Sequence, residues 1–84
     1  MATIRTRETT GTYGINCTPC TVLVAEDHRG GAWYCVEGSA NVNYTPDADL
    51  LTPGVDVETL DDTDTFTWRG GVDDLETLEA AIEA

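Results

Sequence analysis

The stretch that decides the fold runs from residue 21 to 36 and reads TVLVA (21–25), EDHRGG (26–31) and AWYCV (32–36). Its two apolar runs are short and rich in β-branched or aromatic residues, a composition typical of buried strands. The glycine pair between them can adopt the positive φ angles that tight hairpin turns require. We therefore predict a central β-hairpin over about residues 21–37.

Weaker signals extend a sheet on both sides of this hairpin. Residues 1–14 are rich in Thr and alternate loosely, which predicts an edge strand or an extended arm. Further strands are expected at 40–44, just before Pro46, and at 65–68. The segment 46–64 carries prolines, a glycine and many aspartates and is predicted to be a solvated, irregular connection.

A C-terminal helix is predicted over about residues 73–83. Asp73 is the expected N-cap, and Glu76 follows in the capping-box position. The apolar residues of this segment fall on one stripe of a helix: Leu75, Leu78 and Ile82. The 84 residues are thus expected to form a single α+β domain, a small antiparallel sheet of three to five strands with this helix packed on it.

The charge of the chain indicates the medium in which it works. Sixteen acidic residues stand against four basic ones, which gives a net charge of -12, and all four basic residues are Arg. At molar salt the Debye length falls to about 3 Å, so most of the resulting self-repulsion disappears. The excess of acid, the missing Lys and the abundant Thr and Ala resemble proteins of halophilic archaea and their viruses. This resemblance implies a protein that folds in multimolar salt.

Composition also narrows the classes of partner and the location. Repulsion from phosphates disfavours nucleic-acid binding, with nucleic-acid mimicry left as a minor alternative. No stretch approaches the ~20 apolar residues of a membrane span. Residues 1–12 lack the apolar core of a secretory signal. We expect no membrane span, and a location in the cytoplasm of a halophile or in a virion.

The Cys-x-x-Cys pair, Cys17 and Cys20, is the strongest candidate for chemistry. Together with Cys35 and His28 it could supply four zinc ligands, and zinc is the one cofactor to consider. The predicted hairpin opposes this, because it sets Cys35 opposite residues 24–26 and more than about 13 Å from Cys20. The motif also resembles the active-site motif of thioredoxin-like proteins, although there it opens a helix. A local disulfide or two free, packed thiols is the remaining interpretation.

The sequence holds no recognisable catalytic set. His28 is the only histidine, and it lies beside a polar turn without a Ser or Cys partner in a known motif. The glycine pairs 30–31 and 70–71 are not followed by the Lys of a phosphate-binding loop. The acidic run 61–64 lacks the spacing and the central Gly of an EF-hand. We therefore expect that the protein is not an enzyme.

A domain of this size does not readily bury all of its aromatic residues, and Trp and Tyr are frequent anchors of protein interfaces. The candidate interface residues are Trp33, Tyr34, Tyr44, Trp68, Arg5 and Arg7. Our leading hypothesis is a non-catalytic accessory subunit that docks on a larger homo- or hetero-oligomeric protein assembly, most concretely a capsid-decorating or head–tail accessory protein of a virion. The alternative is a small zinc-binding or redox C-x-x-C module that mediates protein–protein contact.

Overall fold

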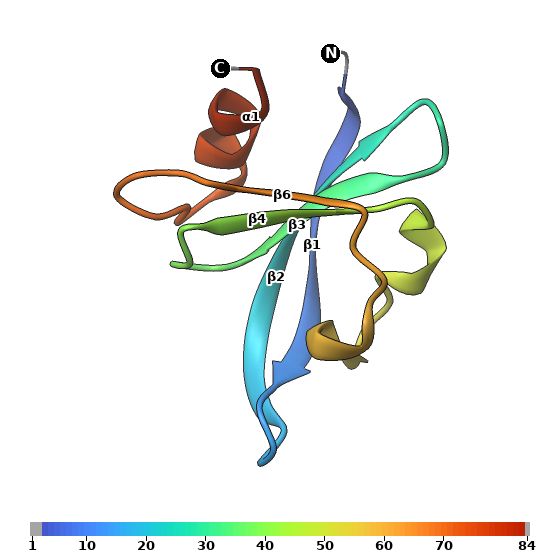
Figure 1. Cartoon of the computed structure of the whole chain (residues 1–84), viewed down its shortest axis with the longest axis vertical. Coiled ribbons are helices and arrows are strands. Elements are labelled where there is room, and N and C mark those ends of the chain that lie inside the picture. Colours follow the sequence, from blue (N-terminus) through green and yellow to red (C-terminus); the bar gives the residue numbers. More distant parts are fainter. Residues whose placement is uncertain (1–2, 84) are drawn as a thin grey trace.

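The computed structural model describes the backbone of residues 3–83 and the side chains of residues 5–83. The chain forms one six-stranded sheet and a C-terminal α-helix (Figure 1), which confirms the α+β prediction. The elements are β1 (Thr3–Tyr13), β2 (Thr18–Asp27), β3 (Ala32–Val36), β4 (Asn41–Thr45), β5 (Val55–Asp56), β6 (Asp64–Thr67) and α1 (Leu75–Glu83). The strand order is β5-β1-β2-β3-β4-β6, so the sheet has one strand more than the three to five expected, and it is mixed rather than antiparallel because the two-residue β5 runs parallel to β1.

The central hairpin of β2 and β3 forms as predicted. Asp27 N donates to Gly31 O at the turn, and Gly30 adopts a φ of 86°. A side chain at Gly31 would collide with the hydroxyl of Tyr44, so this glycine is required by a close approach. Cys35 lies opposite Leu23, one residue earlier than expected, because the turn includes Gly31.

The sheet is covered on both faces, which explains why the run 22–25 is apolar throughout. Successive side chains of a strand point to opposite faces, so the run serves two separate cores. The loop-side core consists of Val22, Val24, Ala32, Tyr34, Ala48 and Leu51. The helix-side core consists of Leu23, Ala25, Cys35, Val42, Val72 and Leu78. Each fully buried Val or Leu contributes about 1.5–3 kcal/mol to folding.

Strand β1 pairs with β2 from Thr3 opposite Asp27 to Tyr13 opposite Thr18, with a register shift between Thr3 and Arg5 and continuous pairing from Arg5 onward. On its other side only Gly11 and Thr12 pair with a strand, the two-residue β5. A Cβ at Gly11 would lie 2.9 Å from both Val22 Cγ2 and Val55 O, so glycine permits this tight junction. The N-terminal segment is therefore part of the sheet and forms its edge from residue 3 to residue 10.

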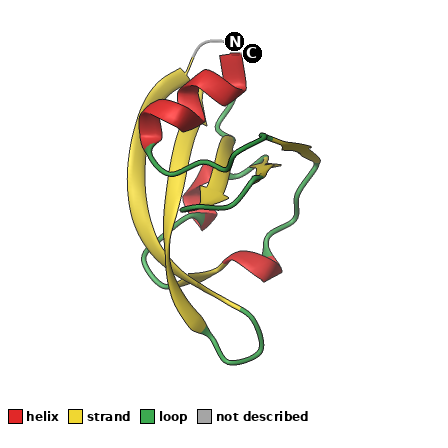
Figure 2. Cartoon of the chain, turned by 90° about the vertical axis from the view of Figure 1, so that its left-hand side faces the viewer, coloured by secondary structure: helices red, strands yellow, loops and turns green. Residues whose placement is uncertain are grey.

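The helix α1 begins later than expected and is capped by Asp74, so the prediction of Asp73 as the N-cap is wrong by one residue. Thr77 N donates to Asp74 Oδ1 over 2.8 Å. Hydrogen bonding from Thr77, first from its side chain and then from its backbone N–H, lowers the pKa of the Asp74 carboxyl. Leu78 and Ala81 are buried against the helix-side core, and Figure 2 shows α1 lying across the long strands.

The connection 46–64 is more ordered than its composition suggests. It contains two 3₁₀ turns, η1 (Ala48–Leu50) and η2 (Val57–Thr59), as well as β5. Asp47 caps η1 and Asp56 caps η2, each by accepting a bond from the backbone N–H two residues later. The aspartates that predict a solvated loop therefore also build its turns, while Ala48 and Leu51 close the loop-side core.

Candidate docking surface

The hairpin of β1 and β2 projects well beyond the rest of the molecule (Figures 1 and 2). Its turn is fixed by positive φ angles at Gly14 (80°) and Cys17 (52°) and by a bond from Cys17 N to Gly14 O. We call residues 13–18 the hairpin tip. Ile15 at this tip is 98% exposed, and Tyr13 is 43% exposed. The start of β1 and the end of α1 lie at the opposite end of the molecule.

The tip lies in the middle of the longest uncharged stretch of the chain. From Thr9 to Ala25 there is no charged residue, so the sixteen acids and four arginines all lie outside it. Burial explains the absence of charged residues only at the end of this stretch, where Val22 to Ala25 are core residues. Residues 13–19 are largely exposed, so their neutrality is not a consequence of burial. The tip is thus an uncharged projection from an acidic chain, with one almost fully exposed apolar side chain, Ile15.

The tip is held in place before any partner binds. Gly14 N donates to Glu58 Oε1 over 2.5 Å, which ties the turn to η2. Beside it, Tyr13, Val36, Glu37 and Ser39 line a shallow groove of about 310 Å³. A contact element that is already ordered loses less conformational entropy on binding.

The structure does not bring the cysteines and His28 together. Strand β2 is extended from Thr18, which sets the Cα atoms of Cys17 and Cys20 about 10 Å apart, beyond the ~7 Å reach of a disulfide. Cys20 packs against the loop-side core, whereas Cys35 is fully buried in the helix-side core on the other face. His28 is exposed in the turn after β2.

The state of the thiols follows from this placement. All three cysteines are free. Burial raises the pKa of Cys35 to about 11 and also raises the pKa of Cys20, so both side chains stay protonated at neutral pH. Among residues 5–83 no group of three or more His, Cys, Asp or Glu side chains is arranged to hold a metal ion. The geometry therefore gives the zinc interpretation no ligand set.

The aromatic residues proposed for an interface are mostly engaged in packing. Tyr34 is 1% exposed, and its hydroxyl donates to Asp62. Burial, followed by the bond to Asp62, raises the pKa of Tyr34. Trp33 packs edge-to-face on Tyr44, with ring centroids 5.0 Å apart, and Trp68 packs against the helix-side core. These four side chains pack within the domain, so less of their surface is available to a partner.

Part of this aromatic group still lines a surface groove. The groove has a volume of about 430 Å³ and is lined by Trp33, Phe66, Thr67, Trp68, Ala81 and Ile82. Trp33 Nε1 is buried and has no hydrogen-bond partner among the described residues. The groove is a second apolar surface, but nothing in its charge or shape indicates what binds there.

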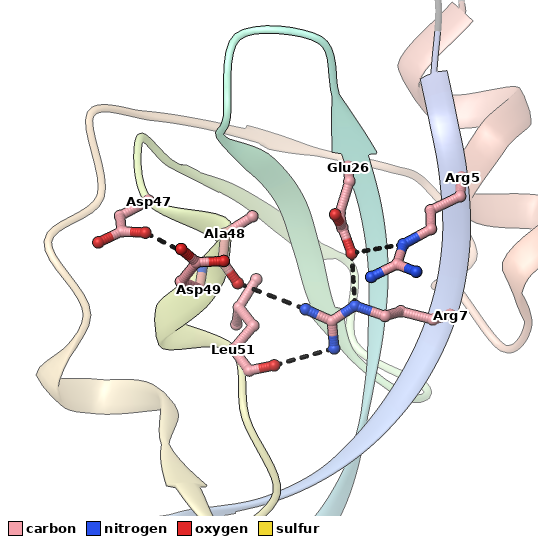
Figure 3. A network of polar contacts seen from close by, with 7 residues as sticks. All are labelled: Arg5, Arg7, Glu26, Asp47, Ala48, Asp49 and Leu51. Atoms are coloured by element: carbon pink, nitrogen blue, oxygen red, sulfur yellow. Dashed lines mark hydrogen bonds and ion pairs between the residues drawn. The ribbon is translucent and has the colours of Figure 1, made fainter.

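Arg5 and Arg7 form a polar network at the edge of the sheet (Figure 3). Both donate from Nε to Glu26 Oε2, over 3.0 Å and 2.6 Å. Arg7 also donates to Leu51 O and Ala48 O, so it holds the connection after η1 against the sheet. Its bond to Glu26 is the main cause that lowers the pKa of that carboxyl.

The two arginines differ in how much of each side chain remains free to bind a partner. The Arg5 side chain is 65% exposed and that of Arg7 is 27% exposed. Among the described residues, the terminal nitrogens of Arg5 have no hydrogen-bond partner, whereas those of Arg7 are used. Of the two arginines proposed for an interface, Arg5 is thus the one that keeps its terminal nitrogens available.

Residue-by-residue reasoning missed Ile15, because a lone Ile in a turn-like segment carries no motif. The absence of charge from Thr9 to Ala25, in a chain of net charge -12, is the signal that could have found it. The one α-helix of the described part is too short to cross a membrane. In comparisons with known proteins, no family model, no curated protein and no solved structure matches the chain.

Proposed function

We propose that this chain is a small, non-catalytic docking subunit of a larger protein assembly in multimolar salt, and that it attaches through the hairpin tip. The observation that carries the proposal is the exposure of Ile15, 98%, at the end of a projecting hairpin whose residues 9–25 carry no charge. Burying one such side chain in a partner contributes about 1.5–3 kcal/mol. The groove beside Tyr13 adds area to the same contact.

The chemistry of the tip suits the proposed medium. In multimolar salt, ion pairs at a surface are screened within about 3 Å. Apolar contacts are not weakened in this way, and salts that are excluded from protein surfaces strengthen them. A docking element whose affinity comes from Ile15 and Tyr13 would thus be weakened less by this medium than one that relies mainly on exposed ion pairs.

Particle fractionation tests this proposal. Lysates or purified particles of the producing cells are sedimented in multimolar salt, and the chain is located by mass spectrometry. We expect it to migrate with a large particle at fixed stoichiometry. A particle that holds capsid proteins makes it a virion component, and one that holds cellular proteins makes it a cellular subunit. Migration as a free 9.0 kDa chain would overturn the proposal.

A matched pair of variants tests the role of the tip. We expect Ile15→Asp to release the chain from the particle. Leu50→Asp is the control, because Leu50 is also an exposed apolar residue, 47% exposed, but lies in η1 away from the tip. Release by both variants, or by neither, would show that the tip is not the docking element.

A further inference from the structure

The edge of β1 offers a second surface, which is independent of the hairpin tip. β5 pairs only with Gly11 and Thr12, so β1 has no strand partner on this side from residue 3 to residue 10 within the described structure. An open strand of this length is a template for the addition of another strand. The question is which partner this edge accepts.

The backbone groups available on this edge follow from the register. Glu37 N donates to Thr21 O, so Thr21 directs its carbonyl toward β3, away from β1. Thr21 lies opposite Thr10, so the backbone groups of Thr10 point away from β2, toward the outer side of β1. The bond that Thr10 O accepts from Gly54 N on that side agrees with this direction. Backbone groups alternate in direction along a strand. Thr6 and Glu8 therefore present their N–H and C=O groups outward.

A second copy of the chain is a poor partner for antiparallel pairing at this edge. Outward residues must face outward residues in an antiparallel ladder. If Thr6 of one copy lies opposite Thr6 of the other, Arg5 lies opposite Arg7. If Thr6 lies opposite Glu8, Arg7 of one copy lies opposite Arg7 of the other. In the third register, Glu8 of one copy lies opposite Glu8 of the other. Each register sets like charges directly across from one another, which is destabilising.

The side chains favour an acidic strand instead. Arg7 lies opposite Val24, a residue of the loop-side core, so Arg5 and Arg7 lie on that face of the sheet. They share one carboxylate, Glu26, and Asp49 lines the same pocket, so positive and negative charges balance there and the preference for acid rests on the unused terminal nitrogens of Arg5. The terminal nitrogens of Arg5 are free to form a bidentate pair with a carboxylate. Glu8, exposed on the other face, disfavours acid there.

We propose that the edge of β1 binds an extended segment of a partner protein by strand addition, with its backbone on Thr6 and Glu8 and a carboxylate on Arg5. The segment carries its acidic residues at alternate positions, on the face of the sheet that holds Arg5, and uncharged residues on the face that holds Glu8. Its acidic character fits a partner from the same salt-adapted proteome.

Peptide binding tests this proposal. The probe is a short blocked peptide of alternating Thr and Glu, and its control has Gln in place of Glu. Binding is followed by NMR of the labelled full chain, in the salt that keeps it folded. We expect shifts and slowed exchange of the Thr6 and Glu8 amides, and binding of the Glu peptide that is up to about fivefold tighter at the lowest salt that keeps the chain folded, with a preference that shrinks as salt is added, as for one exposed ion pair.

Variants separate the backbone and side-chain parts of the site. Arg5→Gln should remove the preference for the Glu peptide, whereas Arg69→Gln, at an exposed arginine after β6, should keep it. Thr6→Pro should abolish binding, because it removes an outward N–H and no bond to β2, and Thr6→Val should not. The wild-type amide data do not depend on whether the proline variant folds.

Three results would overturn the proposal: equal affinity for the two peptides, shifts confined to other strands, or no binding. Concentration-dependent dimerisation that protects Thr6 and Glu8 would assign the edge to a second copy instead. Because Ile15 lies outside this site, Ile15→Asp should leave peptide binding unchanged, so failure here does not bear on the docking role of the tip.

Discussion

Tyr44 donates its hydroxyl hydrogen to Oδ2 of Asp27, and this bond of 2.5 Å ties β4 to the turn between β2 and β3. Asp27 is 4% exposed, yet it also accepts from the backbone N–H groups of Arg29 and Gly31. Burial alone raises the pKa of Asp27, but these three bonds and the charge of Arg29 outweigh it, so the pKa lies below its usual value. One buried carboxylate thus organises the turn on which the central hairpin depends.

Replacement of Tyr44 by Phe should weaken this turn. The variant keeps the ring that packs on Trp33 but leaves the Asp27 carboxylate with one bond fewer. We expect the free energy of unfolding to fall by about 1.5–3 kcal/mol, the contribution of a hydrogen bond to a charged group. Denaturant unfolding at constant salt measures it. Tyr13→Phe, at an exposed tyrosine of the tip, is the control and should change little.

Stability should fall in acid because of Asp27 and Glu26. Both carboxyls have a lowered pKa in the folded chain. Each therefore contributes stability that is complete above the unfolded pKa, about 4, and is lost as the pH falls through the lower folded pKa. Unfolding free energies between about pH 6 and pH 3 should decline. An Asp27→Asn variant with an unchanged pH profile would contradict the role given to Asp27.

The thiols should react in the order of their exposure. Cys17 is exposed, Cys20 is intermediate and Cys35 is buried with a pKa of about 11. A thiol reagent should therefore label Cys17 fast and Cys35 only on the timescale of unfolding. Replacing Cys17 and Cys20 together by Ser should leave the melting temperature nearly unchanged, and so should a chelator. A large loss caused by the chelator would restore the metal interpretation, whereas a loss confined to the Ser variant would reflect the packing of Cys20 against the loop-side core.

Arg7 should matter more for stability than Arg5. Arg7 bonds to Glu26 and to two backbone carbonyls, those of Ala48 in η1 and of Leu51 directly after it. We expect Arg7→Met to cost about 2 kcal/mol, because the carbonyls of Ala48 and Leu51 lose a charged donor. Arg5→Met should cost about 0.2–1 kcal/mol, since the Arg5 side chain is 65% exposed and solvent screens its ion pair. Equal losses in denaturant unfolding would contradict this assignment.

Added salt should stabilise the fold. The net charge of -12 produces self-repulsion that is large in dilute buffer and screened at molar salt. The melting temperature is therefore expected to rise between dilute buffer and multimolar KCl, and to rise less in a variant with several surface aspartates changed to Asn. A chain that is equally stable in dilute buffer would contradict the salt-adapted interpretation.

The sequence predicts the elements whose signals are local. The hairpin of β2 and β3 is specified by two β-branched or aromatic runs around Gly30 and Gly31, and α1 by a single apolar stripe. Strands β4 and β6 also lie within a residue of the predicted ranges. In each case the residues that form the element also carry its pattern.

Long-range contacts could not be read in the same way. β5 consists of two residues, Val55 and Asp56, and exists only because Gly11 lets the connection approach β1. The loop-side core depends on Leu51, which belongs to no periodic apolar pattern in the sequence. Its backbone carbonyl is held by Arg7, which is distant in the sequence. The candidate site could not be predicted from single residues for a related reason. Ile15 stands out because the segment around it has no charged residues, which is a property of the whole segment rather than of one residue.

The two ends of the described chain and the hairpin tip lie at opposite ends of the molecule, which has a practical consequence. A fluorescent reporter or affinity handle fused after α1 would be separated from the tip by the length of the sheet, and the principal extent of the chain is 35 Å. Such a fusion leaves Ile15 free to engage its partner. The location of the assembly could then be imaged in living cells without disturbing the contact under study.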